Sequence, residues 1–248
     1  MEERSTAAAI SAGTGVTAGL AALLGPASIH LGLLEPLGGF YVFGLGVLLG
    51  VPLSLGFGIA GLIRTRSGSE RTGRERAWAG IAAAAILSGV LLNGAGLLGG
   101  SAPPIHDITT DIDDPPVFSA AVQRATGRSN GTDYPDGGAD VPAQQRAAFP
   151  DLAPIEVDLP PAEALRRARE TAEALGWTVS WVDEETLRME AFEVTRVFQF
   201  VDDIAIRVRR AGSGSVIDLR SNSRVGGGDI GANAARIIAF RDRLLQGQ

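Results

Sequence analysis

Hydrophobic residues follow two different patterns along the chain, and the pattern changes near residue 100. Three long apolar stretches come first, at about residues 7–30, 40–63 and 77–99. The second and third contain the roughly 20 apolar residues that a helix needs to cross about 30 Å of hydrocarbon. The first is weaker, and it reaches that length only if the helix continues through the Gly25–Pro26 pair. The pattern predicts a membrane anchor of three helices.

The distribution of arginines predicts how these helices are oriented. RTRSGSERTGRER, between the second and third stretches, holds five arginines from Arg64 to Arg76, whereas the turn between the first two holds none. Cytoplasmic loops of membrane proteins carry an excess of basic residues. We therefore expect a multi-pass protein of the inner membrane, with a cytoplasmic N-terminus and a periplasmic or extracellular C-terminal domain. A signal peptide is the alternative for the first stretch, but MEERST carries two glutamates where a signal peptide is basic.

The rest of the chain predicts an α+β domain. Residues 101–152 are rich in Pro, Gly and Asp and lack periodicity, which predicts an extended segment and loop. In residues 153–248 a short strand precedes a helix that begins at Pro161 and ends before Gly176. Four strands of alternating pattern and a last helix follow. The order β-α-β-β-β-β-α predicts a two-layer domain, with two helices on one face of an antiparallel sheet of four to five strands.

The alternation also assigns individual side chains to faces. Trp177, Val179 and Trp181 are expected on one side of their strand. Asp229 is placed to cap the last helix. Its expected buried stripe is Ile230, Ala234, Ile237, Ile238, Leu244 and Leu245. On the polar side of the sheet, we expect Asp218, Glu190 and several arginines to form a solvated ladder, with about 0.2–1 kcal/mol for each pair.

Composition removes several classes of function. The chain has a net charge of −6, and all 22 of its basic residues are arginine. An acidic balance without a basic tail argues against nucleic acid as a partner. The absence of cysteine excludes disulfides, thiol nucleophiles and cysteine metal sites.

The segment PPIHDITTDIDDPP, residues 103–116, contains the first candidate chemistry. His106, Asp107 and Asp111 are possible acid, base or metal-ligating groups, which gives the hypothesis of a metal-dependent or acid/base hydrolase. However, their spacing matches neither a calcium loop nor a zinc triad, so we expect no metal. The four prolines favour a stiff strap instead.

The segment RSNSRVGGGDIG contains the second candidate. Gly226-x-Gly228-x-x-Gly231 has the spacing of a dinucleotide-binding loop, but the flanking sheet is antiparallel and no second strand follows. We therefore expect no cofactor. Arg220, Arg224 and the N–H groups of the glycine turn can instead hold a small anion.

Several blocks occur in an order that resembles a known family. They are PPIHDITTDIDDPPVF, MEAFEVTRVFQFVDD and IDLRSNSRVGGGDIGANAARI. On the basis of these blocks, the region from about Pro103 to Leu245 resembles the bacterial domain-of-unknown-function 1499 family. The resemblance implies that membrane spans precede the domain, and it brings no established reaction or ligand. It also implies that IHDITTD, DD, RSNSR and DIGANAARI are the signature positions of the family. The candidate ligand-binding residues are His106, Asp107, Asp111, Arg220, Ser221, Asn222, Arg224, Gly226, Gly228, Asp229 and Asn233.

These observations favour a binding protein over an enzyme. We expect a non-catalytic domain outside the cytoplasm that binds a partner protein or a small anionic ligand. The alternatives are the hydrolase and an accessory subunit of a membrane complex. Gly15-xxx-Gly19 and Gly46-xxx-Gly50 let helices approach closely, either within the chain or against a membrane-protein partner.

Overall fold

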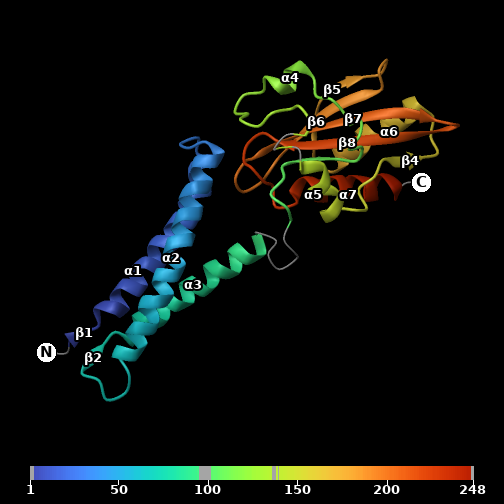
Figure 1. Cartoon of the computed structure of the whole chain (residues 1–248). Helices are drawn as coiled ribbons and strands as arrows, with labels where there is room; N and C mark the ends of the chain where they lie inside the picture. The colour runs from blue at the N-terminus through green and yellow to red at the C-terminus, as the bar shows by residue number, and fades with distance from the viewer. Residues whose placement is uncertain (1–2, 95–101, 136–137, 139, 247–248) are drawn as a thin grey trace. The chain divides into compact units, whose positions relative to one another are not determined.

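The structure, a computed structural model, describes residues 3–94, 102–135, 138 and 140–246 (Figure 1). The chain forms two compact units. The first contains Met1–Gly100 and Val197–Gln199, and the second contains Ser101–Arg196 and Phe200–Gln248. The first is built by helix packing and the second by a sheet covered with helices.

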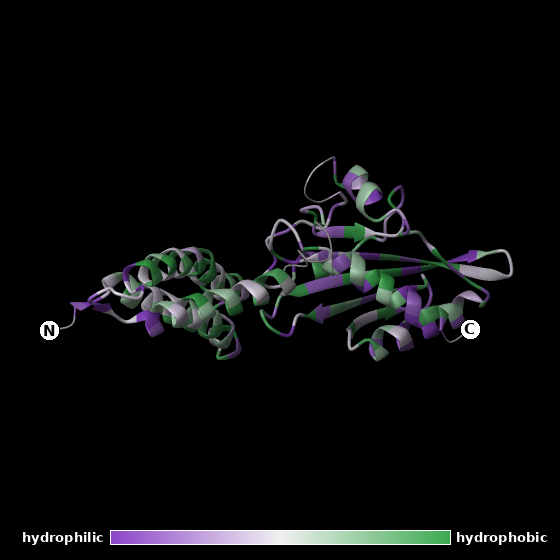
Figure 2. Ribbon diagram, turned by 90° about the horizontal axis from the view of Figure 1, so that it is seen from below, coloured by the Kyte–Doolittle hydropathy of each residue, from purple (hydrophilic) through white to green (hydrophobic). Residues whose placement is uncertain are grey.

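Three long helices make up the first unit, as predicted: α1 (Thr6–His30), α2 (Pro36–Arg64) and α3 (Arg74–Gly94). All three are long and apolar enough to cross a membrane. In Figure 2 the ribbons of these helices are mostly green or pale, and the hydrophilic colour gathers near the N-terminus, where β1 (Glu3–Arg4) pairs with β2 (Arg71–Thr72). The third span was expected to reach Gly99, and residues 95–99 lie outside the described residues.

Small residues allow the helices of the first unit to approach closely. A Cβ added at Gly46 or Gly50 would lie 2.3 or 2.4 Å from the Cβ of an alanine on α1, so α1 and α2 pack on these glycines. The Ser11 and Ser54 hydroxyls each donate a hydrogen bond to the other residue's carbonyl, at 2.8 and 2.7 Å. A Cβ at Gly19 would meet nothing within 4 Å. A membrane-protein partner for the glycine-rich helices stays a prediction.

The second unit is an antiparallel sheet with helices, which confirms the predicted α+β class. Its strands are β3 (Asp107–Thr109), β4 (Ile155–Val157), β5 (Thr178–Asp183), β6 (Arg188–Val194), β7 (Val201–Ala211) and β8 (Gly214–Ser223). They run in the order β3-β8-β7-β6-β5, and β4 also pairs with β8. The predicted helices are α6 (Pro161–Ala174) and α7 (Ala232–Leu245). The segment 101–152, expected as extended chain and loop, contributes β3 and the short helices α4 (Ala120–Gln123) and α5 (Val141–Ala148).

The main core lies between the sheet and helices α6 and α7. Trp177 stacks on Phe240 of α7, with ring centroids 5.4 Å apart. In the predicted α7 stripe, Ala234, Ile237 and Leu244 are buried, whereas Ile230 and Leu245 are exposed. Ile230 is exposed because α7 begins after it: Gly231 is the N-cap, and Ile230 has a positive φ of 56°.

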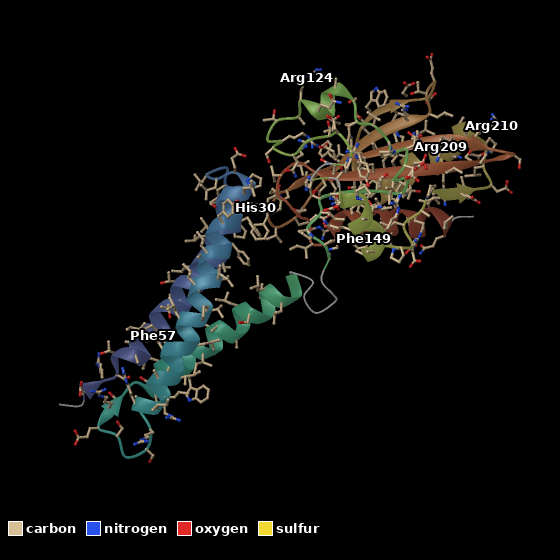
Figure 3. All side chains as sticks on the ribbon, viewed as in Figure 1. His30, Phe57, Arg124, Phe149, Arg209 and Arg210 are labelled. Carbon is tan, nitrogen blue, oxygen red and sulfur yellow. The ribbon has the colours of Figure 1, made fainter. Side chains whose placement is uncertain are left out.

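The two faces of the sheet have different covers. We call the face toward α6 and α7 the inner face, and the opposite one the outer face. Helix α4 and the loops around it lie on the side of the sheet opposite α7 (Figure 1). Arg124, which directly follows α4, is on that side too (Figure 3). Phe118, Val122 and Ala205 form a small second core there, so the outer face is covered in part rather than left to solvent.

Candidate functional site

The segments IHDITTD and RSNSR meet in the folded domain. Strand β3 pairs with the end of β8, so that Asp107 lies opposite Asn222 and Thr109 opposite Arg220. Side chains alternate between the faces of a sheet. Asp107 and Arg220 therefore point to the outer face, whereas Ser221 points to the inner face. The segments share a strand pair, but their side chains are divided between two surfaces.

On the outer face, Asp107 and Arg220 form a fully buried ion pair. Their side chains are 0% and 1% exposed. The Arg220 Nε and Nη2 groups donate to the two carboxylate oxygens at 2.9 and 2.7 Å. The guanidinium also lies 4.9 Å from the ring centroid of Phe118 and 5.3 Å from that of Tyr134. Arg220 is thus neutralised within the protein and shielded by two rings.

Desolvation by burial, with the nearby Asp107 charge as a second cause, raises the pKa of Tyr134 to about 12. Its hydroxyl is buried without a hydrogen-bond partner among the described residues.

A second carboxylate holds two arginines beside this pair. Asp203 accepts hydrogen bonds from Arg224 at 2.8 and 2.9 Å and is also paired with Arg128. The Asp203 hydrogen bond raises the pKa of Arg224. Arg128 donates a further bond of 2.7 Å to the Asn222 side chain. These bonds fasten the loop that carries Arg128 to β7 and β8.

The other signature residues join α7 to the inner face. Asn233 donates to the His106 carbonyl at 2.9 Å and accepts from the Ser221 hydroxyl at 2.6 Å. Arg236 donates to Ser221 at 3.0 Å and to Asp202 at 2.7 Å. This buried cluster explains the polar residues on a strand face that otherwise packs apolar side chains.

The glycine turn before α7 is shaped by close contacts. Gly226 has a positive φ of 90° and accepts a hydrogen bond from Asn130 at 2.8 Å. A Cβ at Gly228 would lie 3.0 Å from the backbone of Pro104. Asp229, two residues before the N-cap, accepts from the N–H groups of Gly231 and Asn233 at 2.8 and 2.6 Å. Burial raises the pKa of its carboxyl group.

The ladder expected on the polar side exists, but its central acid is buried. Asp218 is 0% exposed and accepts from Arg207 at 3.0 Å and from Arg209 at 2.7 and 2.9 Å. Asp111 accepts from Arg209 at 3.1 Å. Within the described parts of the chain, no three His, Asp or Glu side chains form a group that fits a metal ion.

The anion and hydrolase hypotheses stay predictions. Both need free groups, and the described structure has Arg220 bound to Asp107 and Arg224 bound to Asp203.

A hollow surface lies on the outer face next to the edge strand β5, and we call it the outer groove. Two adjoining hollows of about 120 and 500 Å³ form it. Both are bordered by Ser119, Trp181 and Glu190. The smaller also contacts Pro116, Val117, Phe118, Arg188 and Arg207, and the larger contacts Val122, Phe192, Asp203 and Arg224.

The sequence-based placement of Trp181 beside Trp177 and Val179 was wrong. The register between β5 and β6 shifts between Val179 and Trp181, which is a β-bulge at Ser180. The extra residue reverses the alternation, so Trp181 points to the outer face, opposite Glu190, and remains 42% exposed. Bulges of this kind often re-aim a side chain next to a functional site.

Glu190 lies at the base of the groove and is only 3% exposed. One of its oxygens accepts from the Ser119 N–H group at 2.5 Å, and the other accepts from the Ser119 hydroxyl at 2.7 Å. The sequence predicted a pairing with arginine. Among the described residues, no basic side chain forms an ion pair with Glu190.

Comparison with protein families gives one match. The family model described as "Protein of unknown function (DUF1499)" matches residues 107–244, which is more than half of the chain. The chain belongs to this family. The search of curated proteins returned no match for this DUF1499 protein. The matched region begins at Asp107, the partner of Arg220, and contains the whole outer groove.

Sequence reasoning missed the groove residues of this DUF1499 protein. Nothing in WTVSWV marks Ser180 as a bulge, so Trp181 was placed in the core. Ser119 lies in a segment that was read as loop. Glu190, Trp181 and Arg224 were each named, but in a ladder, in the core and at an anion site, and nothing in the sequence brought them together.

Proposed function

We propose that this protein is a non-catalytic, membrane-anchored binding protein, whose second unit holds a segment of a partner protein in the outer groove. The anchor is the set of three helices that are long and apolar enough to cross a membrane. The hydrolase alternative needs Asp107 as a free acid or base, and its carboxylate is already held by Arg220. Binding is therefore the function that we favour.

The proposal places the second unit outside the cytoplasm, in the cell envelope. The loop between α2 and α3 carries Arg66 and Arg71, and basic loops stay in the cytoplasm. The chain crosses the membrane once more in α3 before the second unit begins.

Cysteine labelling tests this orientation without background, because the chain has no cysteine. Ser67→Cys lies in the arginine loop and Ser213→Cys in the β7–β8 turn, and both positions are exposed. In spheroplasts, a membrane-impermeant maleimide should label Ser213→Cys at once and Ser67→Cys only after permeabilisation. The reverse order would contradict the proposed orientation.

The exposed Trp181 is the observation that carries the binding proposal. A tryptophan that is 42% exposed in a groove, with Val117 66% exposed at the rim, offers the apolar anchor surface typical of protein interfaces. The groove lies beside β5, which pairs with β6 only and leaves its other edge open among the described residues. An extended segment can add to such an edge.

Photo-crosslinking in living cells tests the proposal. A photoreactive amino acid at Val117 should give a discrete protein adduct, and Trp181→Ala should reduce that adduct strongly because it removes the anchor. The matched control position is Arg169, exposed on α6 on the other side of the sheet. Equal adducts at both positions, or no effect of Trp181→Ala, would contradict groove binding.

A further inference from the structure

We infer that the outer groove recognises its partner through a basic side chain, whose guanidinium or ammonium group contacts Glu190 beside the indole of Trp181. The inference rests on the proposed function and deepens it, because it names the chemistry of the segment that the groove binds.

The buried acids of the sheet differ in whether an arginine pairs with them. Asp107, Asp202, Asp203 and Asp218 are buried sheet residues, and each forms an ion pair with at least one arginine. Glu190 is as deeply buried and has no such partner within the described chain. A charged group removed from water is normally paired. We therefore expect a bound molecule to supply the positive charge that pairs with Glu190.

The Glu190 carboxylate has hydrogen-bonding capacity that the described residues do not use. A carboxylate offers about four lone-pair positions, and Ser119 uses two of them. Both hollows of the groove border Glu190, so the remaining positions adjoin space that a ligand can enter. The Ser119 bonds also hold the carboxylate in one position before a ligand arrives.

The indole of Trp181 lies beside the Glu190 carboxylate. Trp181 and Glu190 lie directly opposite each other on β5 and β6, where Cβ atoms of a pair are about 4.5–5.5 Å apart. A cation at the carboxylate is thus within reach of the indole, the aromatic group that attracts cations most strongly. The bulge at Ser180 creates this pairing, and the Ser180 hydroxyl fixes it by donating to the Glu190 carbonyl at 3.2 Å.

The other charged groups of the groove indicate which hollow the cation enters. Arg188 borders the smaller hollow, is exposed and has no ion-pair partner among the described residues. It would repel a second cation there. In the larger hollow, the wall includes the ring of Phe192, and Arg224 is ion-paired with Asp203, which it shares with Arg128. The larger hollow offers about 500 Å³ against about 120 Å³, and its arginine is ion-paired, so we expect the basic side chain to enter there.

Two small probes test the inference on the full chain in lipid nanodiscs. One is Nα-acetyl-arginine N-methylamide. The other is its citrulline counterpart, which has nearly the same shape and no charge. Saturation-transfer NMR on the probe measures binding, and 5-fluorotryptophan labelling adds a signal for each of the three tryptophans. We expect the arginine probe to shift the Trp181 signal and to bind at least about tenfold more tightly than the citrulline probe.

Variants separate recognition from structure. Glu190→Gln should lower the affinity for the arginine probe about tenfold or more. Ser119→Ala keeps the carboxylate and should change that affinity by less than about threefold. Trp181→Leu, which retains Glu190, should also lower the affinity for the arginine probe. An unchanged Trp177 signal shows that each variant is folded. Equal binding of the two probes, or equal losses in Glu190→Gln and Ser119→Ala, would overturn the inference.

The two experiments distinguish a failure of the basic-anchor inference from a failure of the proposed function. If the probes bind equally well but the Val117 adduct still depends on Trp181, the groove binds a partner without a basic anchor, and only this inference is wrong. If the adduct is absent as well, groove binding itself is refuted.

Discussion

The inner and outer faces of the same sheet are held together by different forces. On the inner face, apart from the Asp202–Arg236 cluster, apolar side chains such as Met189, Ile204 and Ile217 are at most 1% exposed and pack against two helices. On the outer face, buried carboxylates bind arginines from neighbouring strands and from the covering loops. Apolar packing tolerates small changes of shape, whereas a buried ion pair fails when one partner is removed. We therefore expect the outer face to be the more sensitive of the two to substitution.

Removing one charge from the buried outer pair should have the largest effect. Asp107→Asn is nearly isosteric but leaves the Arg220 guanidinium buried without its counter-ion, so we expect a loss of about 3–5 kcal/mol in unfolding free energy. Denaturant unfolding followed by tryptophan fluorescence measures the loss. The double variant Asp107→Leu/Arg220→Met is the control, and it should lose much less than the sum of its single changes. A loss below about 1 kcal/mol for Asp107→Asn would show that the pair is not structural.

Alkaline pH should weaken the outer face through Tyr134. Its folded-state pKa of about 12 lies above the ordinary value of 10.0, so folding favours the neutral phenol. The stability that this contributes is complete below pH 10 and is lost as the pH rises toward 12. We expect a loss of up to about 2 kcal/mol in this window.

Tyr134→Phe is the matched control for this effect. It should match the parent at pH 7, because the hydroxyl has no hydrogen-bond partner among the described residues, and it should be the more stable protein above pH 10. Unfolding curves at pH 7, 10 and 11.5 measure the difference. Parallel curves for the two proteins would contradict the role of Tyr134.

A conservative change on the inner face should cost less than the change of charge on the outer face. Ile217→Val removes one methylene group from a fully buried position, and we expect a loss of about 0.5–1.5 kcal/mol. The same unfolding assay measures it. If Ile217→Val cost as much as Asp107→Asn, the difference between the faces would disappear.

The inner face was predictable from the sequence and the outer face largely was not. Alternation in β7 and β8 is a local signal, and the apolar residues that alternate along these strands, Ile204, Ile206 and Ile217, lie in the core. The outer face depends on contacts between distant segments: Asp107 meets Arg220 across 113 positions and Arg128 meets Asn222 across 94. Neither local periodicity nor composition contains that information. Residues 101–152 were therefore predicted to be an extended segment and loop, although they supply a strand and part of the outer cover.

The position of Trp181 shows how a local irregularity defeats pattern reading. One bulged residue, Ser180, moves a tryptophan from the expected core to the groove. By contrast, Gly226 and Asp229 are read correctly as a turn before a helix, because glycine at positive φ and aspartate near helix N-termini have local causes.

The unfolding free energy of Glu190→Gln tests the central claim most directly: Glu190 is the one buried acid on the described sheet that is kept for a ligand instead of a structural partner. Because no internal cation would lose its counter-ion, Glu190→Gln should stay within about 1 kcal/mol of the parent, unlike Asp107→Asn measured alongside it. A loss of about 3–5 kcal/mol for Glu190→Gln, equal to that of Asp107→Asn, would show that Glu190 is part of the structural network and would contradict the account.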